Sequence, residues 1–316
     1  MGLVMPTKEA SQRTKTAFVS TNSISQGEQV GILWNELFNT YKSKIHFAHR
    51  TFSWSNEARG NAAVHVVIIG FANYDIDEKR IFEYEHIKGE PQEVKAKNIN
   101  PYLVEGNDVT ITKKRDAICL VPEISFGSMP NDGGGLLLSN EEKEQLILNE
   151  PNVQKFIKPL LSAHEFINGE FRWCLWLVDV NPTEIKGSSE IFSRINQVKE
   201  HRNNSTRAAT KKLADFPTLF GENRQPKSDY ILIPRHSSEN RVYIPFGFFS
   251  SDYIVSDSCL FVANATHYHF GVLNSLMHMI WVKTVCGRIK SDYRYSNELV
   301  YNNYPFPQSP TDKQKE

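Results

Sequence analysis

The stretch 62–71, Ala-Ala-Val-His-Val-Val-Ile-Ile-Gly-Phe, decides the fold of the first part of the chain. It is apolar and rich in β-branched side chains, which predicts a central strand covered on both faces of a sheet. Around it, residues 16–20 and 45–48 are predicted strands, and the apolar spacing over 30–38 predicts an amphipathic helix. The order strand, helix, strand, strand is that of the terminal part of an α/β sheet, because a complete doubly wound domain needs further βα units. We therefore expect the chain to begin inside a domain.

The remainder of the chain has the pattern of an α+β fold. Residues 72–115 are charged and turn-rich, with one strand expected at 80–84, and we place a domain boundary near 100–116. Beyond it we expect strands at 172–178, 229–234 and 242–249, and helices at 184–204 and 269–285. The polar loop 236–241 lies between two of these strands and is expected to project several side chains.

Composition narrows the class of protein. The 316 residues include 36 Lys and Arg, 36 Asp and Glu, and 40% hydrophobic residues, which is typical of a soluble globular protein of about two domains. The sequence contains no apolar run of the roughly 18 residues that a membrane helix needs, and its N-terminus lacks a signal-peptide pattern. Four cysteines lie far apart without a Cys-x-x-Cys pair. Neither a zinc framework nor a disulfide framework is predicted, and a cytoplasmic location is expected.

The net charge of zero hides a basic stretch. Residues 194–241 carry 10 Lys and Arg against 5 Asp and Glu, a net charge of +5. Its basic residues on or just after the predicted long helix are Lys199, Arg202, Arg207, Lys211 and Lys212, and those that continue it are Arg224, Lys227, Arg235 and Arg241. Such a stretch permits one surface for a polyanion such as DNA. The alternative interpretation is a solvated helix face.

Motifs of catalysis are absent from the sequence. There is no Gly-x-Gly-x-x-Gly, phosphate loop, His-Glu-x-x-His or Gly-x-Ser-x-Gly pattern. The glycines at 133–135 follow no predicted strand and indicate a loop. His267 and His269 would need further ligands to hold a metal, so we predict no metal site. The segment 100–103, Asn-Pro-Tyr-Leu, lacks the second proline of the Asn-Pro-Pro-Tyr/Phe signature of amino-methyltransferases and is predicted to be a plain loop.

Several longer stretches carry a family resemblance. Residues 17–29 (AFVSTNSISQGEQ) and 46–58 (HFAHRTFSWSNEA) are the first of them. The further matching stretches are 165–169, 212–215, 217–222, 268–273, 286–293 and 301–305. Through these stretches the sequence resembles the MmeI-type (type IIL) restriction–modification enzymes, which are class I S-adenosylmethionine-dependent DNA methyltransferases. The resemblance extends from about residue 16 to residue 307.

The resemblance implies an order of domains. Enzymes of this kind carry a nuclease, a methyltransferase domain, a target-recognition domain and a C-terminal segment, and they methylate N6 of adenine. The resemblance implies that residues 1–110 are the terminal part of the Rossmann-like methyltransferase sheet, 111–250 an α+β target-recognition domain, and 251–316 a helical C-terminal segment. The cofactor-binding glycine motif and the Asn-Pro-Pro-Phe motif would lie upstream. We therefore expect no catalytic residue, no bound S-adenosylmethionine and no activity of this chain alone, although the parent protein would be an enzyme.

The resemblance also implies candidate site residues. In related amino-methyltransferases an aromatic ring stacks on the flipped adenine, as this chemistry requires. Phe52 is our candidate and Trp54 the reserve, and the alternative is that both are ordinary core aromatics. In this family the loop matching 237–241 varies with the base recognised, which implies base contact by Glu239 and Arg241 and, more weakly, by Arg207 and Tyr243. Charge alone predicts phosphate contact by Lys211, Lys212, Arg224 and Lys227.

The expected partners are double-stranded DNA and the N-terminal methyltransferase half, with no membrane. One loop does not determine the DNA sequence recognised, because indirect readout adds positions that no side chain touches. A second hypothesis stays open. The chain could be a standalone specificity or scaffold subunit that acts with a separate methyltransferase chain.

Overall fold

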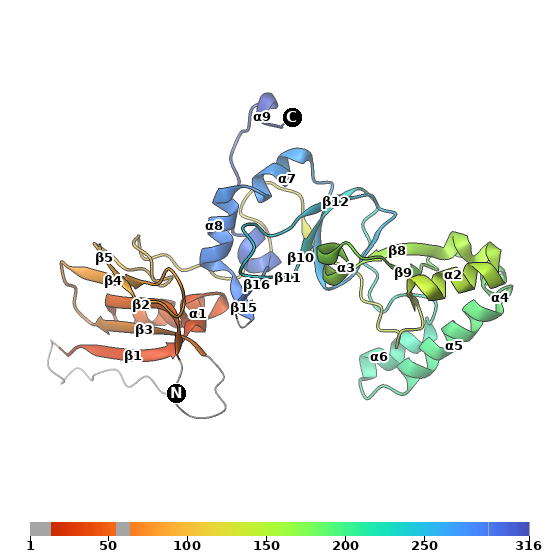
Figure 1. Ribbon diagram of the computed structural model, residues 1–316, viewed down its shortest axis with the longest axis horizontal. Coiled ribbons are helices and arrows are strands. Elements are labelled where there is room, and N and C mark those ends of the chain that lie inside the picture. The colour runs from red at the N-terminus through yellow and green to blue at the C-terminus, as the bar shows by residue number, and fades with distance from the viewer. Residues whose placement is uncertain (1–13, 55–63, 290, 316) are drawn as a thin grey trace. The chain divides into compact units, whose positions relative to one another are not determined.

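The computed structural model describes residues 14–54, 64–289 and 291–315 (Figure 1). The chain divides into two compact units, Met1–Ile118 with Ile280–Pro305, and Cys119–Met279 with Phe306–Glu316. We call them unit 1 and unit 2. Within the described ranges no helix is both long enough and apolar enough to cross a membrane.

Unit 1 is built on a five-stranded sheet. Its strands, in spatial order, are β1 (Thr16–Thr21), β3 (Val64–Ala72), β2 (Lys44–Trp54), β4 (Lys79–Glu83) and β5 (Gln92–Ala96). β3 pairs antiparallel with β1 and β2, while β2 and β4 run parallel. The central strand predicted at 62–71 is confirmed as β3 from residue 64 on, since β3 lies between two partners and its residues 66, 67 and 69–72 are buried. Residues 62 and 63 lie outside the described residues.

The helix predicted at 30–38 is also confirmed. After the short 3-10 turn η1 (Asn22–Ser25), Gly27 precedes α1 (Glu28–Asn39), and its positive φ of 63° is a value that glycine adopts without strain. Its buried stripe includes Trp34, which is 1% exposed and donates its indole N–H to the Ile24 carbonyl oxygen at 2.7 Å. The helical spacing of apolar residues in the sequence therefore predicts the position of this helix correctly.

Two asparagines connect the C-terminal part of unit 1 to the segment 112–115 through hydrogen bonds. The elements here are the end of α8 (Leu276–Val285), the hairpin β15 (Gly287–Ile289) and β16 (Asp292–Arg294), and the π-helical turn η4 (Asn297–Tyr301). The buried Asn302 amide donates to the carbonyl oxygens of Lys114 and Arg115, at 2.9 and 2.8 Å. The Asn303 amide donates to that of Thr112 at 2.9 Å. Both side chains thus hold the segment 112–115 in place.

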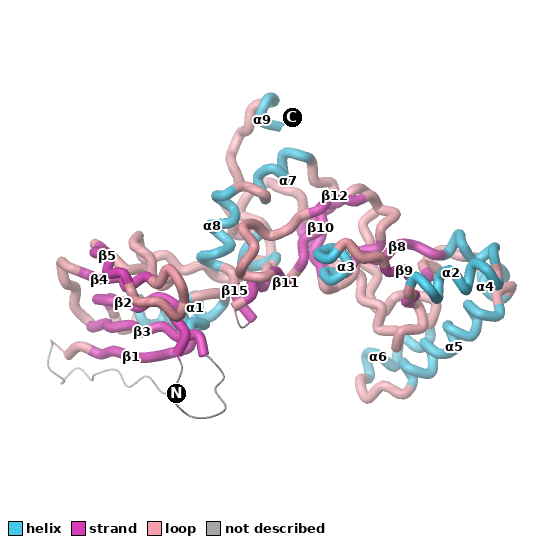
Figure 2. Tube along the Cα trace, viewed as in Figure 1, coloured by secondary structure: helices cyan, strands magenta, loops and turns pink. Residues whose placement is uncertain are grey.

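Unit 2 contains two four-stranded sheets and most of the helices (Figure 2). The first sheet has the order β12 (Gly247–Phe249), β10 (Tyr230–Pro234), β14 (Cys259–Ala263) and β6 (Ile124–Phe126). The second has the order β13 (Ile254–Val255), β8 (Ile157–Leu161), β9 (Arg172–Leu175) and β7 (Leu137–Leu138). The other elements are β11 (His236–Ser237), α2 (Asn140–Asn149), η2 (Pro151–Phe156), α3 (Ala163–Asn168), α4 (Pro182–Lys186), α5 (Ser189–Asn203), α6 (Ala208–Lys212), η3 (Leu213–Asp215), α7 (His267–Leu273) and α9 (Asp312–Lys315).

Helices expected to be continuous are interrupted. The helix predicted at 184–204 is two helices, α4 and α5, because the Ser188 hydroxyl accepts the Ile191 N–H at 3.1 Å and caps α5. The helix predicted at 269–285 is likewise α7 and α8, since the Ser275 hydroxyl accepts the His278 N–H at 3.2 Å. In both places a serine stabilises a new helix start that the apolar period does not reveal.

Strand lengths also differ from expectation. The strand predicted at 242–249 is β12 alone, since Pro245 cannot donate a ladder hydrogen bond. The strand predicted at 172–178 ends at Leu175. β5 was not predicted, because four of its five residues are exposed and its sequence lacks an apolar alternation. The segment 251–316, expected to be helical, also contains the strands β13–β16.

A buried histidine makes the stability of unit 2 sensitive to pH. His278 is 1% exposed, its ring lies 5.9 Å from that of Phe246, and burial lowers its pKa from 6.5 to about 4. Between these pKa values the unfolded chain binds more protons than the folded one, so stability falls as the pH falls. We expect a loss of about 3 kcal/mol between about pH 7 and pH 4 from this residue.

Urea unfolding of wild-type protein and His278→Phe at both pH values measures this contribution. The variant should lose less stability on acidification by about that amount. An identical pH dependence of the two proteins would show that His278 is protonated without cost in the fold.

Candidate nucleic-acid interface

An aromatic cluster lies where the parallel strands β2 and β4 end. Phe52 stacks on Tyr84, with ring centroids 5.0 Å apart and an interplanar angle of 19°. His49 stacks on Phe82 at 4.2 Å and 6°. Trp54, at the end of β2, is 45% exposed, and its ring lies 6.1 Å from that of Phe52. The carboxyl ends of parallel strands are where α/β sheets bind ligands, so this cluster is a candidate binding surface.

A hydrogen bond holds the cluster together. His49 Nδ1 and the Tyr84 hydroxyl are 2.9 Å apart. Burial lowers the pKa of His49, and burial together with the charge of Glu90 raises the pKa of Tyr84. At neutral pH a neutral imidazole and a neutral phenol therefore share this hydrogen bond, and the tautomer of His49 decides which of them donates. The sequence marks neither His49 nor Tyr84 as a site residue, since only the pairing of β2 with β4 brings them together.

The opposite end of the same strands is closed by ion pairs. Lys79 is 1% exposed and contacts Asp75 and the Asn98 side-chain oxygen, each at 2.8 Å. The Asn98 amide donates to Asp108 at 2.7 Å, and Asp108 pairs with Lys44 at 3.0 Å. These polar groups satisfy one another, so this end of the sheet has a structural role. Among the described residues the two ends thus differ, since one carries satisfied ion pairs and the other carries aromatic rings.

A hollow of about 550 Å³ adjoins the aromatic cluster on the face of the sheet. His49 and Phe82 line it, together with Phe47 and Gly70. The ring of Phe47 lies across Gly70, where a Cβ atom would be 2.0 Å from the ring. Glycine at position 70 therefore allows the Phe47 ring to pack directly against the backbone of β3.

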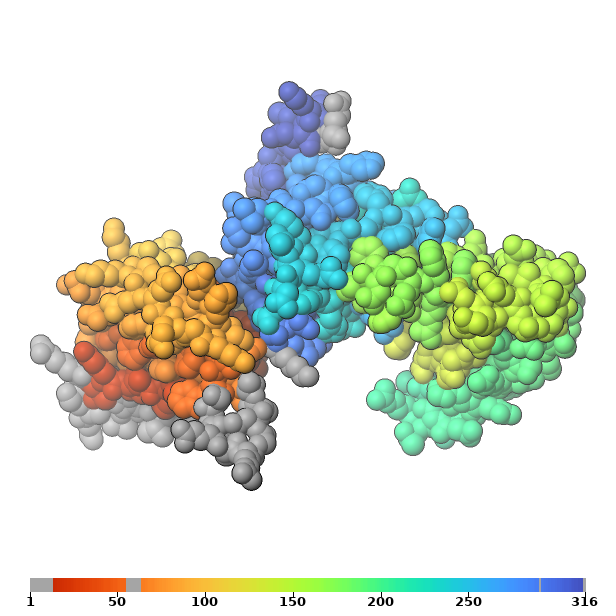
Figure 3. All heavy atoms as spheres, viewed as in Figure 1, coloured from red at the N-terminus to blue at the C-terminus, as the bar shows by residue number. Residues whose placement is uncertain are grey.

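In unit 2 three exposed cations of the basic stretch lie on α6 or at its start. Arg207, Lys211 and Lys212 are exposed, while Thr210 on the same short helix is buried. This segment, blue-green in Figure 3, lies at the surface of the unit. The helix therefore presents its cations outward and packs its other side on the fold.

Arg202 does not belong to this exposed surface. The sequence places Arg202 among the cations of the basic stretch, but its side chain is 0% exposed. Its side chain donates to backbone carbonyl oxygens rather than to solvent. Arg235 is half-buried, donates to the Asp257 carbonyl oxygen at 3.1 Å and lies 5.0 Å over the ring of Phe126. The basic surface is therefore smaller than the charge count indicates.

The two remaining phosphate candidates differ in their surroundings. Arg224 pairs with Glu222 and donates to the Gly127 carbonyl oxygen at 3.1 Å, although 40% of its side chain is exposed. Lys227 is exposed. Arg224 would have to exchange its carboxylate partner for a phosphate, whereas Lys227 and the cations of α6 are already presented to solvent.

The loop proposed to read bases is shaped by its own hydrogen bonds. The Arg241 backbone N–H donates to the Ser238 carbonyl oxygen at 3.2 Å, and the Asn240 N–H donates to the Ser238 hydroxyl at 3.3 Å. The Arg241 side chain is exposed, Tyr243 is 41% exposed, and Glu239 is half-buried and in contact with other groups. A compact turn with an outward arginine suits contact with a base edge.

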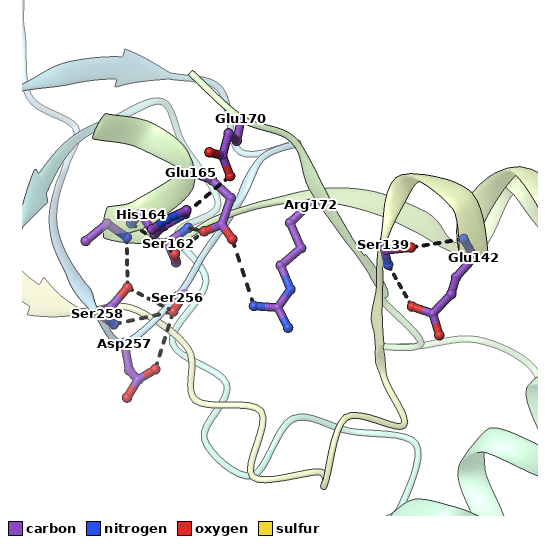
Figure 4. A network of polar contacts seen from close by, with 11 residues as sticks. Ser139, Glu142, Ser162, His164, Glu165, Glu170, Arg172, Ser256, Asp257 and Ser258 are labelled. Atoms are coloured by element: carbon purple, nitrogen blue, oxygen red, sulfur yellow. Dashed lines mark hydrogen bonds and ion pairs between the residues drawn. The ribbon is translucent and has the colours of Figure 1, made fainter. Parts of the chain in front are cut away.

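A hollow in unit 2 is lined by several acidic side chains, in contrast to the basic surface around α6. It measures about 640 Å³ and includes Glu141, Glu142, Glu165 and Glu170 in its lining. Figure 4 shows its polar network, in which Arg172 approaches Glu165 at 3.9 Å. Four carboxylates disfavour a polyanion here, so the surface of unit 2 is electrostatically uneven.

The histidine pair 267 and 269 serves the fold. His269 Nδ1 accepts the Thr266 N–H at 3.1 Å at the start of α7, and His267 stacks on Phe248 at 5.3 Å. Among the described residues, no three or more His, Cys, Asp or Glu side chains are grouped so that they could hold a metal ion.

Comparison with known proteins identifies the class as a DNA methyltransferase region joined to a target recognition domain. Residues 4–83 match the description "MmeI, DNA-methyltransferase domain", and residues 105–308 match "MmeI, target recognition domain". The chain belongs to the MmeI family of restriction–modification DNA methyltransferases. The resemblance stated from the sequence is therefore confirmed.

Two relatives extend the comparison. The chain is 42% identical over 302 residues to DNA methyltransferase A of Bacillus subtilis (strain 168), covering 96% of this chain and 34% of the relative. It is 48% identical to the type IIL restriction–modification enzyme MmeI solved in complex with DNA, with a TM-score of 0.86, covering 96% of this chain and 40% of that one. The chain thus spans about a third to two fifths of the length of these relatives.

The family implies S-adenosylmethionine as methyl donor, and the turn between β1 and α1 does not fit it. A cofactor cradle at such a turn needs open glycine backbone before the helix. Here the Gly27 N–H donates to the Val285 carbonyl oxygen at 3.2 Å, and the position of a Cβ on Gly27 lies 2.9 Å from Cα of Gly287. This turn is therefore used for packing.

Proposed function

We propose that this chain is the target-recognition region of a site-specific DNA adenine-N6 methyltransferase of a restriction–modification system. The observation that carries the proposal is the match of residues 105–308 to the target recognition domain, supported by the likeness to a relative whose structure contains DNA. The exposed cations of α6 and the outward Arg241 support contact with a polyanion.

Within this proposal the residues divide by role. Arg241 takes a guanine edge through two N–H groups, and Glu239 accepts from a cytosine amine, with Arg207 and Tyr243 contributing less. Lys211, Lys212, Arg224 and Lys227 contact phosphates and set the register on the duplex. The adenine stacks against Phe52, with Trp54 beside it.

We further propose that residues 1–110 are the C-terminal part of the methyltransferase domain, 111–250 the DNA target-recognition domain and 251–316 the C-terminal segment. S-adenosylmethionine is held by other residues of the parent protein, and this chain alone transfers no methyl group. Duplex binding at two salt concentrations tests the proposal. Salt-sensitive binding is the expected result. No binding even at low salt would contradict the phosphate contacts and favour a scaffold subunit that acts with a separate methyltransferase chain.

Replacement of Phe52 by alanine tests the stacking role. Stacking of a base on an aromatic ring contributes about 1–3 kcal/mol, so methylation by the full-length enzyme should fall roughly 10- to 100-fold in kcat/KM. Duplex affinity should change little, since phosphate contacts remain. Val94→Ala, at an exposed apolar position on β5, is the control. Equal methylation by Phe52→Ala and wild-type enzyme would contradict the role.

A further inference from the structure

The five N–H groups of the buried Arg202 side chain all donate to backbone carbonyl oxygens. Nε donates to Asn131 at 2.9 Å. The two terminal nitrogens donate to Leu213 at 3.0 Å, Phe216 at 2.9 Å, Pro130 at 3.1 Å and Leu219 at 2.8 Å. A guanidinium has five such donors in a fixed planar fork, so this site uses every one of them.

The acceptors belong to separate segments of unit 2. Pro130 and Asn131 lie in the loop after β6, whereas Leu213, Phe216 and Leu219 follow α6. Arg202 itself is near the end of α5. One side chain therefore ties α5, the loop at 130–131 and the segment 213–219 together.

The short basic helix α6 lies within this clamp. Its five residues lie between Arg202, at one end, and Leu213, whose carbonyl oxygen Arg202 binds, at the other. The Ser205 N–H also donates to the Arg202 carbonyl oxygen at 3.2 Å. A helix of this length is not stable in isolation. Its placement therefore depends on contacts of this kind, together with the buried Thr210.

We propose that Arg202 is a positioning residue for DNA binding, which fixes α6 so that Lys211 and Lys212 face the phosphate backbone together. The proposal rests on the proposed function of these two lysines. Arg202 contacts no DNA itself, because it is fully buried. Lysine at this position would keep the charge but supply three donors from one nitrogen, and could not span the separated carbonyl oxygens.

Salt dependence separates positioning from general damage. The slope of log affinity against log salt counts phosphate contacts, at about 0.9 per contact. Arg202→Lys should reduce the slope by about 2, as Lys211→Ala/Lys212→Ala does. Combining all three changes should reduce it no further. Val198→Ala, an equally buried change one turn earlier on α5, is the matched control and should leave the slope unchanged.

A second variant disturbs the clamp without touching Arg202. A Cβ on Gly221 would lie 2.9 Å from Asn131 Cβ and 3.1 Å from Leu213 Cδ1, so Gly221→Ala pushes the two acceptor segments apart. It should reduce the slope in the same direction. The contrary result is a wild-type slope in both Arg202→Lys and Gly221→Ala, with only the fraction of protein that binds DNA reduced. It would overturn the positioning role while leaving DNA binding by the lysines intact.

Amide hydrogen exchange supplies a readout that needs no DNA. Exchange over 207–215 should rise in Arg202→Lys and Gly221→Ala and stay at the wild-type rate in Val198→Ala. Equal exchange in all four proteins would overturn the clamp itself. Absence of DNA binding by wild-type protein would instead contradict the proposed function, so the two failures are distinguishable.

Discussion

Replacement of Gly127 by alanine is expected to lower the free energy of unfolding of unit 2 by about 3 kcal/mol. A Cβ at this position would lie 2.2 Å from the Ser256 carbonyl oxygen and 2.7 Å from that of Val255. These are backbone atoms and cannot move aside as a flexible side chain would. The Gly127 N–H also donates to the Cys259 carbonyl oxygen at 3.1 Å, so a shift of the strand breaks this bond.

Urea unfolding measures the effect, and a second glycine provides the control. Gly271 lies on α7, is exposed, and has no atom within 4 Å of a Cβ position. Gly271→Ala should therefore stabilise the protein by up to about 1 kcal/mol, because alanine favours the helix. If Gly127→Ala did not lower the free energy of unfolding, the close packing of residue 127 against 255–256 would be contradicted.

Reversal of two charges is expected to have the largest effect on DNA binding. Lys211→Glu/Lys212→Glu should weaken binding of a random duplex by roughly two orders of magnitude at low salt. Each lost phosphate contact removes one release of counterions, and each new carboxylate repels the backbone. Both side chains are exposed at the end of α6, so the change should leave the fold intact.

The control for charge reversal carries the same change elsewhere in unit 2. Lys143 lies on α2, over the ring of Trp173 at 4.0 Å, and the exposed Lys186 ends α4. Lys143→Glu/Lys186→Glu should weaken binding far less, through net charge alone. Equal losses in the two double variants, measured by fluorescence anisotropy, would show that no local phosphate site exists on α6.

Local patterns predicted the first part of the fold well. The β-branched run at 62–71 and the helical spacing at 30–38 act over neighbouring residues, and both predictions are confirmed. β5 was missed because its edge position leaves most of its side chains exposed, so no apolar alternation marks it. The break between α4 and α5 was missed because capping by the single residue Ser188 outweighs the helical spacing of apolar residues on either side.

Tertiary contacts explain what the sequence could not predict about the site. The number of charged residues in a stretch does not show which of them are buried. Arg202 was therefore assigned to a basic surface, although the fold buries it. The contact between His49 and Tyr84 depends on the parallel pairing of β2 and β4. Phe52 was selected from a family resemblance, and the fold surrounds it with aromatic neighbours that no local pattern indicates.

Selection from a random-duplex pool tests the central claim most directly. The wild-type chain is mixed with the pool at low and moderate salt, and bound sequences are compared with those bound by Glu239→Ala and Arg241→Ala. We predict enrichment of one defined site by the wild-type chain. Each variant should lose discrimination at one position, at a cost of about 1–3 kcal/mol. Salt-sensitive binding without any enriched site, unchanged in both variants, would contradict the claim that this chain reads DNA sequence through the loop 237–241.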